Sequence, residues 1–107
     1  MAEIVKLDAA GFQKEVLGAT QPVVVDFTAT WCGPCKMLEP IVKDLALLWA
    51  GKVKVFKLDV DDHSDIAIQY GVMGVPTLIL FVNGQPAQRL SGYQPKDRIL
   101  AKFSPSI

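Results

Sequence analysis

The 107 residues contain little cysteine, little histidine and no excess of either charge. A zinc site needs four ligands, and the two cysteines with His63, the one histidine, fall short of that number. Lysine and arginine together number 11, and so do aspartate and glutamate. Such a balanced surface gives no general attraction to nucleic acid or to an anionic membrane. The composition therefore argues against a zinc protein and against binding of nucleic acid or membrane.

Long apolar runs are also missing. The longest, VPTLILFV from Val75 to Val82, is far shorter than the roughly 20 residues of a membrane-spanning helix. The first residues include Glu3 and Asp8 and lack the apolar core of a signal peptide, so we expect a cytoplasmic location. In a reducing compartment, two closely spaced cysteines are more often catalytic or metal-binding than structural.

Half of the residues are apolar, which predicts one compact domain over residues 1–107 with an α/β fold. Apolar spacing and turn residues predict the order β-α-β-α-β-α-β-β-α. Asn83-Gly84 predicts a hairpin that joins the last two strands. Strands are expected at residues 3–7, 22–27, 52–60, 77–82 and 87–91, and helices at 8–17, 35–49, 61–71 and 95–103. Asp8 is the expected cap of the first helix, Asp61 or Asp62 that of the third, and Pro95 lies in the first turn of the last.

Both cysteines lie in the segment Cys32-Gly33-Pro34-Cys35, between a buried strand and a long helix. If Cys32 caps the helix, its sulfur faces the N–H groups of the first turn, which favours the thiolate and makes Cys32 the nucleophile. Pro34 has no N–H, so the expected donor is the amide of Cys35. Cys35 lies deeper and suits the resolving step. An inert disulfide, two buried thiols or a Cu(I) site are the alternatives.

Asp26 follows three valines in the strand that should be buried on both faces. An unpaired carboxylate in such a place has a raised pKa and can accept the proton of Cys35 during resolution. Lys57 occupies a comparable depth in the third strand and is expected near Asp26. The alternative is an acid at the end of the strand that reaches solvent.

Three segments, DFTATWCGPCKM from Asp26, YGVMGVPTLILFVNG from Tyr70 and LSGYQ from Leu90, resemble the thioredoxin family in order and spacing. The resemblance implies a thioredoxin fold, with a central five-stranded mixed sheet flanked by four helices. It implies a monomeric general protein disulfide reductase that binds no cofactor and acts on disulfide-containing client proteins. Electrons would come from NADPH through a flavoprotein thioredoxin reductase.

The same resemblance assigns roles to individual residues. Cys32 and Cys35 would form the redox-active disulfide, with Cys32 attacking and Cys35 resolving, and Asp26 would be a buried acid paired with Lys57. The Val75–Pro76 bond would be cis, although a trans bond is the default. The substrate-binding surface would consist of six residues: Trp31, Gly33, Pro34, Val75, Pro76 and Gly92.

Some positions depart from the family pattern. Thr28 and Val82 are unusual, and Met73 stands beside the substrate loop where a basic residue is common.

A second hypothesis is a redox-independent binding module, or a subunit of a larger complex, that uses the same apolar face. An oxidase or isomerase is disfavoured by the Gly33-Pro34 pair, which resembles the reducing members of the family.

Overall fold

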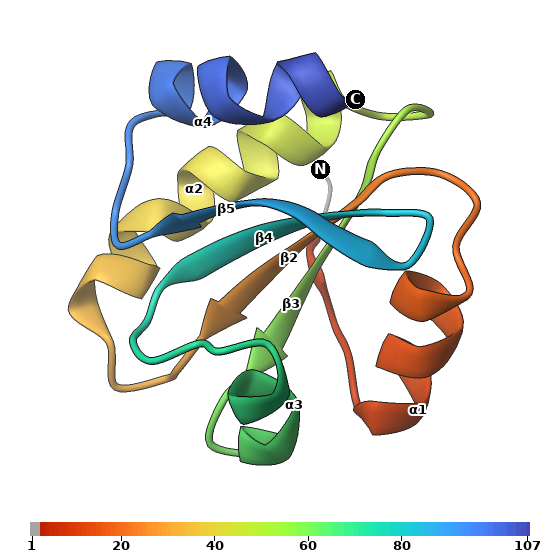
Figure 1. Ribbon diagram of the computed structural model, residues 1–107. Coiled ribbons are helices and arrows are strands. Elements are labelled where there is room, and N and C mark those ends of the chain that lie inside the picture. Colours follow the sequence, from red (N-terminus) through yellow and green to blue (C-terminus); the bar gives the residue numbers. More distant parts are fainter. Residues whose placement is uncertain (1–2) are drawn as a thin grey trace.

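The computed structural model describes residues 3–107, which form a mixed sheet covered by helices on both faces (Figure 1). The strands are β1 (Val5–Lys6), β2 (Val23–Thr28), β3 (Lys54–Asp59), β4 (Thr77–Val82) and β5 (Gln85–Ser91). The α-helices are α1 (Ala9–Phe12), α2 (Gly33–Leu48), α3 (Ser64–Gln69) and α4 (Lys96–Phe103). A π-helical segment, η1 (Gln13–Leu17), continues α1, and a 3-10 turn, η2 (Ser104–Ser106), follows α4. None of the helices within residues 3–107 is long and apolar enough to cross a membrane.

The five strands lie in the order β1-β3-β2-β4-β5. The first three are parallel, β4 runs antiparallel to β2, and β5 runs antiparallel to β4. Asn83 and Gly84 both have positive φ, as a tight turn between adjacent antiparallel strands requires. The arrangement confirms the expected α/β architecture, a five-stranded mixed sheet with four helices.

Alternation along β2 divides its side chains between two cores. Val23, Val25 and Phe27 pack in the core beneath α1 and α3, whereas Val24 packs in the core beneath α2 and α4. By this period-two alternation, Asp26 points toward the face that α2 covers. The tertiary structure thus places a buried carboxylate under the helix that begins beside the cysteines.

Each core joins one pair of helices to the sheet (Figure 1). The first contains Phe12, Val16, Phe27, Phe56, Leu58, Ile66, Ala67, Ile79 and Phe81, among others. The second contains Leu38, Val42, Leu45 and Trp49 from the α2 side with Leu78, Leu80, Ile99 and Phe103. Burial of this apolar surface, at roughly 25 cal/mol per Å², is the main force that holds α2 against the sheet.

Helix ends follow the sequence rules only in part. Asp8 caps α1 as expected, with its Oδ1 accepting the N–H of Gly11 at 2.7 Å. The expected cap of α3 by Asp61 or Asp62 is wrong. The amides of Asp61 and Asp62 instead donate to Oδ1 of Asp59, because that buried carboxylate ends β3 and satisfies the turn that follows.

Two further helix boundaries differ from the sequence expectation. The first helix changes to π-helical geometry from Gln13 instead of staying α-helical to Leu17. Pro95 lies at the N-cap position with extended backbone, just outside α4, instead of inside its first turn.

Candidate active site

The two cysteines form a disulfide at the start of α2. Cys32 is the N-cap residue with extended backbone, and its Sγ accepts the N–H of Cys35 at 3.1 Å. Pro34 occupies the first turn, where its missing N–H leaves no donor unpaired. The predicted cap is therefore confirmed, and one sulfur lies at the electropositive end of the helix.

The two cysteines differ in their surroundings more than in their exposure. Cys32 is 4% exposed and Cys35 3%, so the expected difference in depth is not seen while the disulfide is closed. Both pack against Ala29, with Val60 and Val75 close by. Cys35 also lines a pocket that contains Asp26, whereas Cys32 does not. Only the second cysteine therefore shares a pocket with the buried acid.

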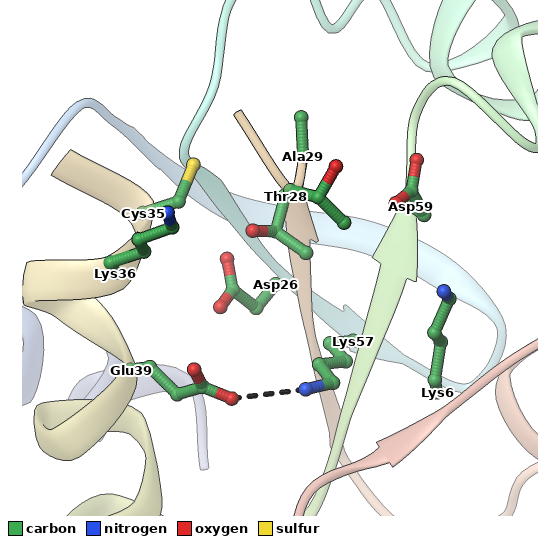
Figure 2. Close-up of a pocket in the computed structure, with 10 residues that line it drawn as sticks. Lys6, Asp26, Thr28, Ala29, Cys35, Lys36, Glu39, Lys57 and Asp59 are labelled. Carbon is green, nitrogen blue, oxygen red and sulfur yellow. Dashed lines mark hydrogen bonds and ion pairs between the residues drawn. The ribbon is translucent and has the colours of Figure 1, made fainter. Parts of the chain in front are cut away.

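That pocket has a volume of ≈ 290 Å³ and lies between α2, β2 and β3 (Figure 2). Asp26 is 3% exposed, and within residues 3–107 its Oδ1 is the buried side-chain oxygen that has no hydrogen-bond partner. Burial, aided by the negative charge of Glu39 and opposed by Lys57, raises the pKa of Asp26 from 3.8 to about 7. The alternative of a solvent-exposed acid at the strand end is wrong.

Lys57 lies where the sequence placed it, but its ammonium has another partner. The sheet register sets Lys57 directly opposite Asp26. The expected ion pair with Asp26 is nevertheless not formed, because Nζ of Lys57 donates to Oε1 of Glu39 at 2.9 Å (Figure 2). Glu39 projects from α2 and is 39% exposed, and the hydrogen bond from Lys57 outweighs the desolvation of its carboxylate, so it stays ionised.

Sequence reasoning missed Glu39. Positions four apart on a helix share a face, so Glu39 lies one turn beyond Cys35 and lines the same pocket. The hydrogen bond from Lys57 lowers the pKa of Glu39 and keeps its carboxylate charged. The spacing of Cys35 and Glu39 was the signal in the sequence that pointed to this neighbour.

The six residues of the expected substrate-binding surface occupy the rim around the disulfide. Trp31 and Val75 line a groove of ≈ 150 Å³, and Val75, Pro76 and Gly92 line an adjoining open groove. The Val75–Pro76 bond is cis, as the family resemblance implies. Gly33 and Pro34 lie at the tip of α2, and nothing surrounds the position of a Cβ at Gly33 or Gly92.

Exposed apolar side chains and the unpaired backbone of Val75 characterise this rim. Trp31 is 68% exposed and its Nε1 donates to Oδ2 of Asp61 at 2.7 Å, while Met73 is 99% exposed. The amide of Gly92 donates to the carbonyl of Pro76 at 2.7 Å and ties the two rim loops together. No residue from 3 to 107 forms a hydrogen bond with the backbone of Val75.

A disulfide held at a helix N-terminus, with a buried carboxylate beneath it and an apolar rim around it, defines a thiol–disulfide oxidoreductase. Within residues 3–107 there is no group of three or more His, Cys, Asp or Glu side chains arranged to hold a metal ion.

Comparison with known proteins names the family. The family profile described as Thioredoxin matches residues 3–104. A thioredoxin of Alicyclobacillus acidocaldarius subsp. acidocaldarius is 46% identical over 98 residues, which are 92% of each chain. A thioredoxin of Staphylococcus aureus is 47% identical over 96 residues, 90% of each chain, and one of Mycobacterium tuberculosis is 44% identical over 100 residues, 94% of this chain and 86% of that relative. The chain belongs to the thioredoxin family.

Proposed function

We propose that this chain is a general protein disulfide reductase, built as a single thioredoxin domain over residues 1–107. The observation that carries the proposal is the hydrogen bond from the Cys35 amide to Sγ of Cys32 at the start of α2. The same N–H and the helix dipole stabilise a thiolate at Cys32 after reduction. Cys32 is therefore the attacking sulfur.

The reaction proceeds through a mixed disulfide. The Cys32 thiolate attacks one sulfur of a client disulfide, forms a bond to it, and expels the other client sulfur as a thiolate that takes up a proton. Cys35 then loses its proton, and its thiolate attacks Sγ of Cys32. This closes the internal disulfide and expels the second client sulfur as a thiolate that takes up a proton. Two electrons pass to the client, and the cysteine pair is oxidised.

Asp26 is the proton acceptor for Cys35 in the second step. Both groups line one pocket, so a proton passes between them directly or through one water (Figure 2). A base is most effective when its pKa lies near the working pH, and the pKa of Asp26 is about 7. Replacement of Asp26 by Asn should therefore slow resolution more than the first attack.

The apolar rim is the docking surface for clients. The unpaired backbone of Val75 pairs with an extended client segment, as an added strand pairs with a sheet edge. Trp31 and Pro76 flank the sulfurs with apolar surface, and Gly33 and Gly92 let the client backbone come close. As in its family, the chain acts as a cytoplasmic monomer and is reduced by a flavoprotein thioredoxin reductase at the expense of NADPH.

Insulin reduction tests this function. With dithiothreitol at a level that is inert by itself, the chain should precipitate insulin by cleaving its interchain disulfides, and Cys32→Ser should abolish the effect. Intact insulin would contradict the reductase. It would favour a redox-independent binding module, for which the exposed Trp31 and Met73 offer the contact surface.

Trapping experiments test the two cysteine roles. Cys35→Ser should accumulate stable mixed disulfides with client proteins, because the resolving thiol is missing. Cys32→Ser should accumulate almost none. Equal trapping by the two variants would contradict the assignment.

A further inference from the structure

Glu39 is a charged group that the proposed reaction does not use. It lies on the same face of α2 as Cys35 and lines the pocket that Cys35 shares with Asp26 (Figure 2). Its Oε1 holds Nζ of Lys57 at 2.9 Å. Asp26 lies opposite Lys57 in the sheet register, yet its buried Oδ1 has no hydrogen-bond partner within residues 3–107.

We propose that Glu39 is a positioning residue that holds the Lys57 ammonium away from Asp26 and so keeps Asp26 a strong proton acceptor for Cys35. The inference rests on the proposed reductase function, in which Asp26 acts on Cys35. If Lys57 were released, its flexible stem would let the ammonium approach the unpaired oxygen directly across the ladder. The ion pair formed there would make Asp26 a weaker base.

Other charges around the pocket have different partners or positions. Asp59, on β3, accepts the amides of the turn after that strand, and Lys6, on β1, pairs with Asp62 at 3.5 Å. Lys36 lines the pocket from α2, and Leu78, the neighbour of Asp26 on β4, is apolar. Glu39 and Lys57 are the two charges whose fields act on Asp26 besides burial.

Those two charges act on Asp26 in opposite directions. Glu39 raises the pKa of Asp26 and Lys57 lowers it, each by less than burial raises it. Loss of the Glu39 charge therefore lowers the pKa of Asp26 for two separate reasons. The negative neighbour disappears, and the positive neighbour becomes free to move closer.

The test follows the titration of Asp26 in the oxidised protein by the NMR shift of its carboxyl carbon. Glu39→Gln keeps the shape of the side chain and should lower the titration midpoint by roughly one pH unit. Asp44→Asn is the matched control, since it removes one negative charge from an exposed position on the same helix and should leave the midpoint unchanged. An unmoved or raised midpoint in Glu39→Gln would overturn the proposal.

A double-mutant cycle tests whether Lys57 moves toward Asp26 when Glu39 is replaced, or whether the charges of Glu39 and Lys57 act on Asp26 independently. Lys57→Met should raise the midpoint more in the Glu39→Gln background than in the wild type, because the released ammonium sits closer to Asp26. An equal rise in both backgrounds would mean that Lys57 does not move, and the positioning role would be excluded. Because a glutamine oxygen can still accept from Lys57, the exclusion requires an equal rise in the Glu39→Ala background as well.

Kinetics connect the titration to the reaction. In Glu39→Gln with both cysteines present, stopped flow measures resolution of the mixed disulfide against pH. This profile should shift downward with the Asp26 midpoint, and its plateau should fall roughly threefold as the base weakens. A shifted midpoint with an unshifted rate profile would also reject the role in the reaction. The NMR measurement needs no client, so an inactive wild type together with a lowered midpoint in Glu39→Gln would refute the reductase and not the Glu39–Lys57–Asp26 geometry.

Discussion

Replacement of Asp26 by Asn should change how the stability of the oxidised protein depends on pH. Asparagine has nearly the same shape but no ionisable group. Any constant cost of burying its amide applies at every pH, so it cancels when the variant is compared with the wild type at two pH values. What remains is the titration of the buried carboxyl group.

The raised pKa of Asp26 determines whether the wild type gains or loses stability as the pH rises. An unfolded aspartate loses its proton near 3.8, whereas the folded protein holds the proton until about pH 7. Between these values the folded state binds more protons than the unfolded state, so the wild type loses stability as the pH rises. The interval from 3.8 to about 7, at about 1.4 kcal/mol per pH unit, corresponds to about 4 kcal/mol. Because Asp26 is 3% exposed, solvent screens little of this effect.

Urea denaturation followed by circular dichroism, with the disulfide kept closed, measures this difference. From pH 4 to pH 8 the free energy of unfolding of Asp26→Asn should rise by about 4 kcal/mol relative to the wild type, most of it between pH 4 and pH 7. Asp44→Asn controls for the loss of one negative charge. A difference between Asp26→Asn and the wild type that stays constant with pH would refute the argument that Asp26 is protonated in the folded state.

Two other predictions concern the hairpin turn and the rim. Gly84 and Gly51 both have positive φ, but a Cβ at Gly84 would lie 2.6 Å from the carbonyl oxygen of Leu17, whereas Gly51 faces open space. Gly84→Ala should therefore cost about 2 kcal/mol more stability than Gly51→Ala in urea denaturation, and equal costs would show that the turn relaxes freely. Asp61→Ala removes the acceptor that holds the indole of Trp31. KM for a client protein should therefore rise roughly fivefold with little change in kcat. Asp61→Asn keeps an acceptor oxygen and should retain most of the affinity. An effect on kcat alone would mean that Asp61 acts in the chemistry.

Local patterns in the sequence were enough to predict the order of the elements. The β-branched run before Asp26 predicts a strand buried on both faces, and β2 is buried over most of its length. Asn83-Gly84 predicts the hairpin, and Cys32 followed by Gly33-Pro34 predicts the capped start of α2. These features depend on backbone preferences over a few residues, so they can be deduced without knowledge of distant contacts.

Predictions from the sequence were wrong where a polar group had more than one possible hydrogen-bond partner. Two acids were available to Lys57, and the fold brought Glu39 within hydrogen-bond distance while Asp26 stayed buried and unpaired. The cap of α3 failed for the same kind of reason, because Asp59 took the amides of the turn. Such choices depend on distances of a few ångströms between separate elements, which periodicity along the chain does not specify.

The sequence by itself determined which atoms are available for chemistry: two sulfurs spaced to start a helix, one acid among valines, and an apolar segment with a proline. Only the tertiary structure decided which of these atoms share a pocket. Packing of α2 on the sheet placed Cys35, Asp26 and Glu39 together around ≈ 290 Å³. The physical reason is that the two hydrophobic cores hold α2 in one position against the strands. That position determines which charged groups lie close enough to form hydrogen bonds with one another.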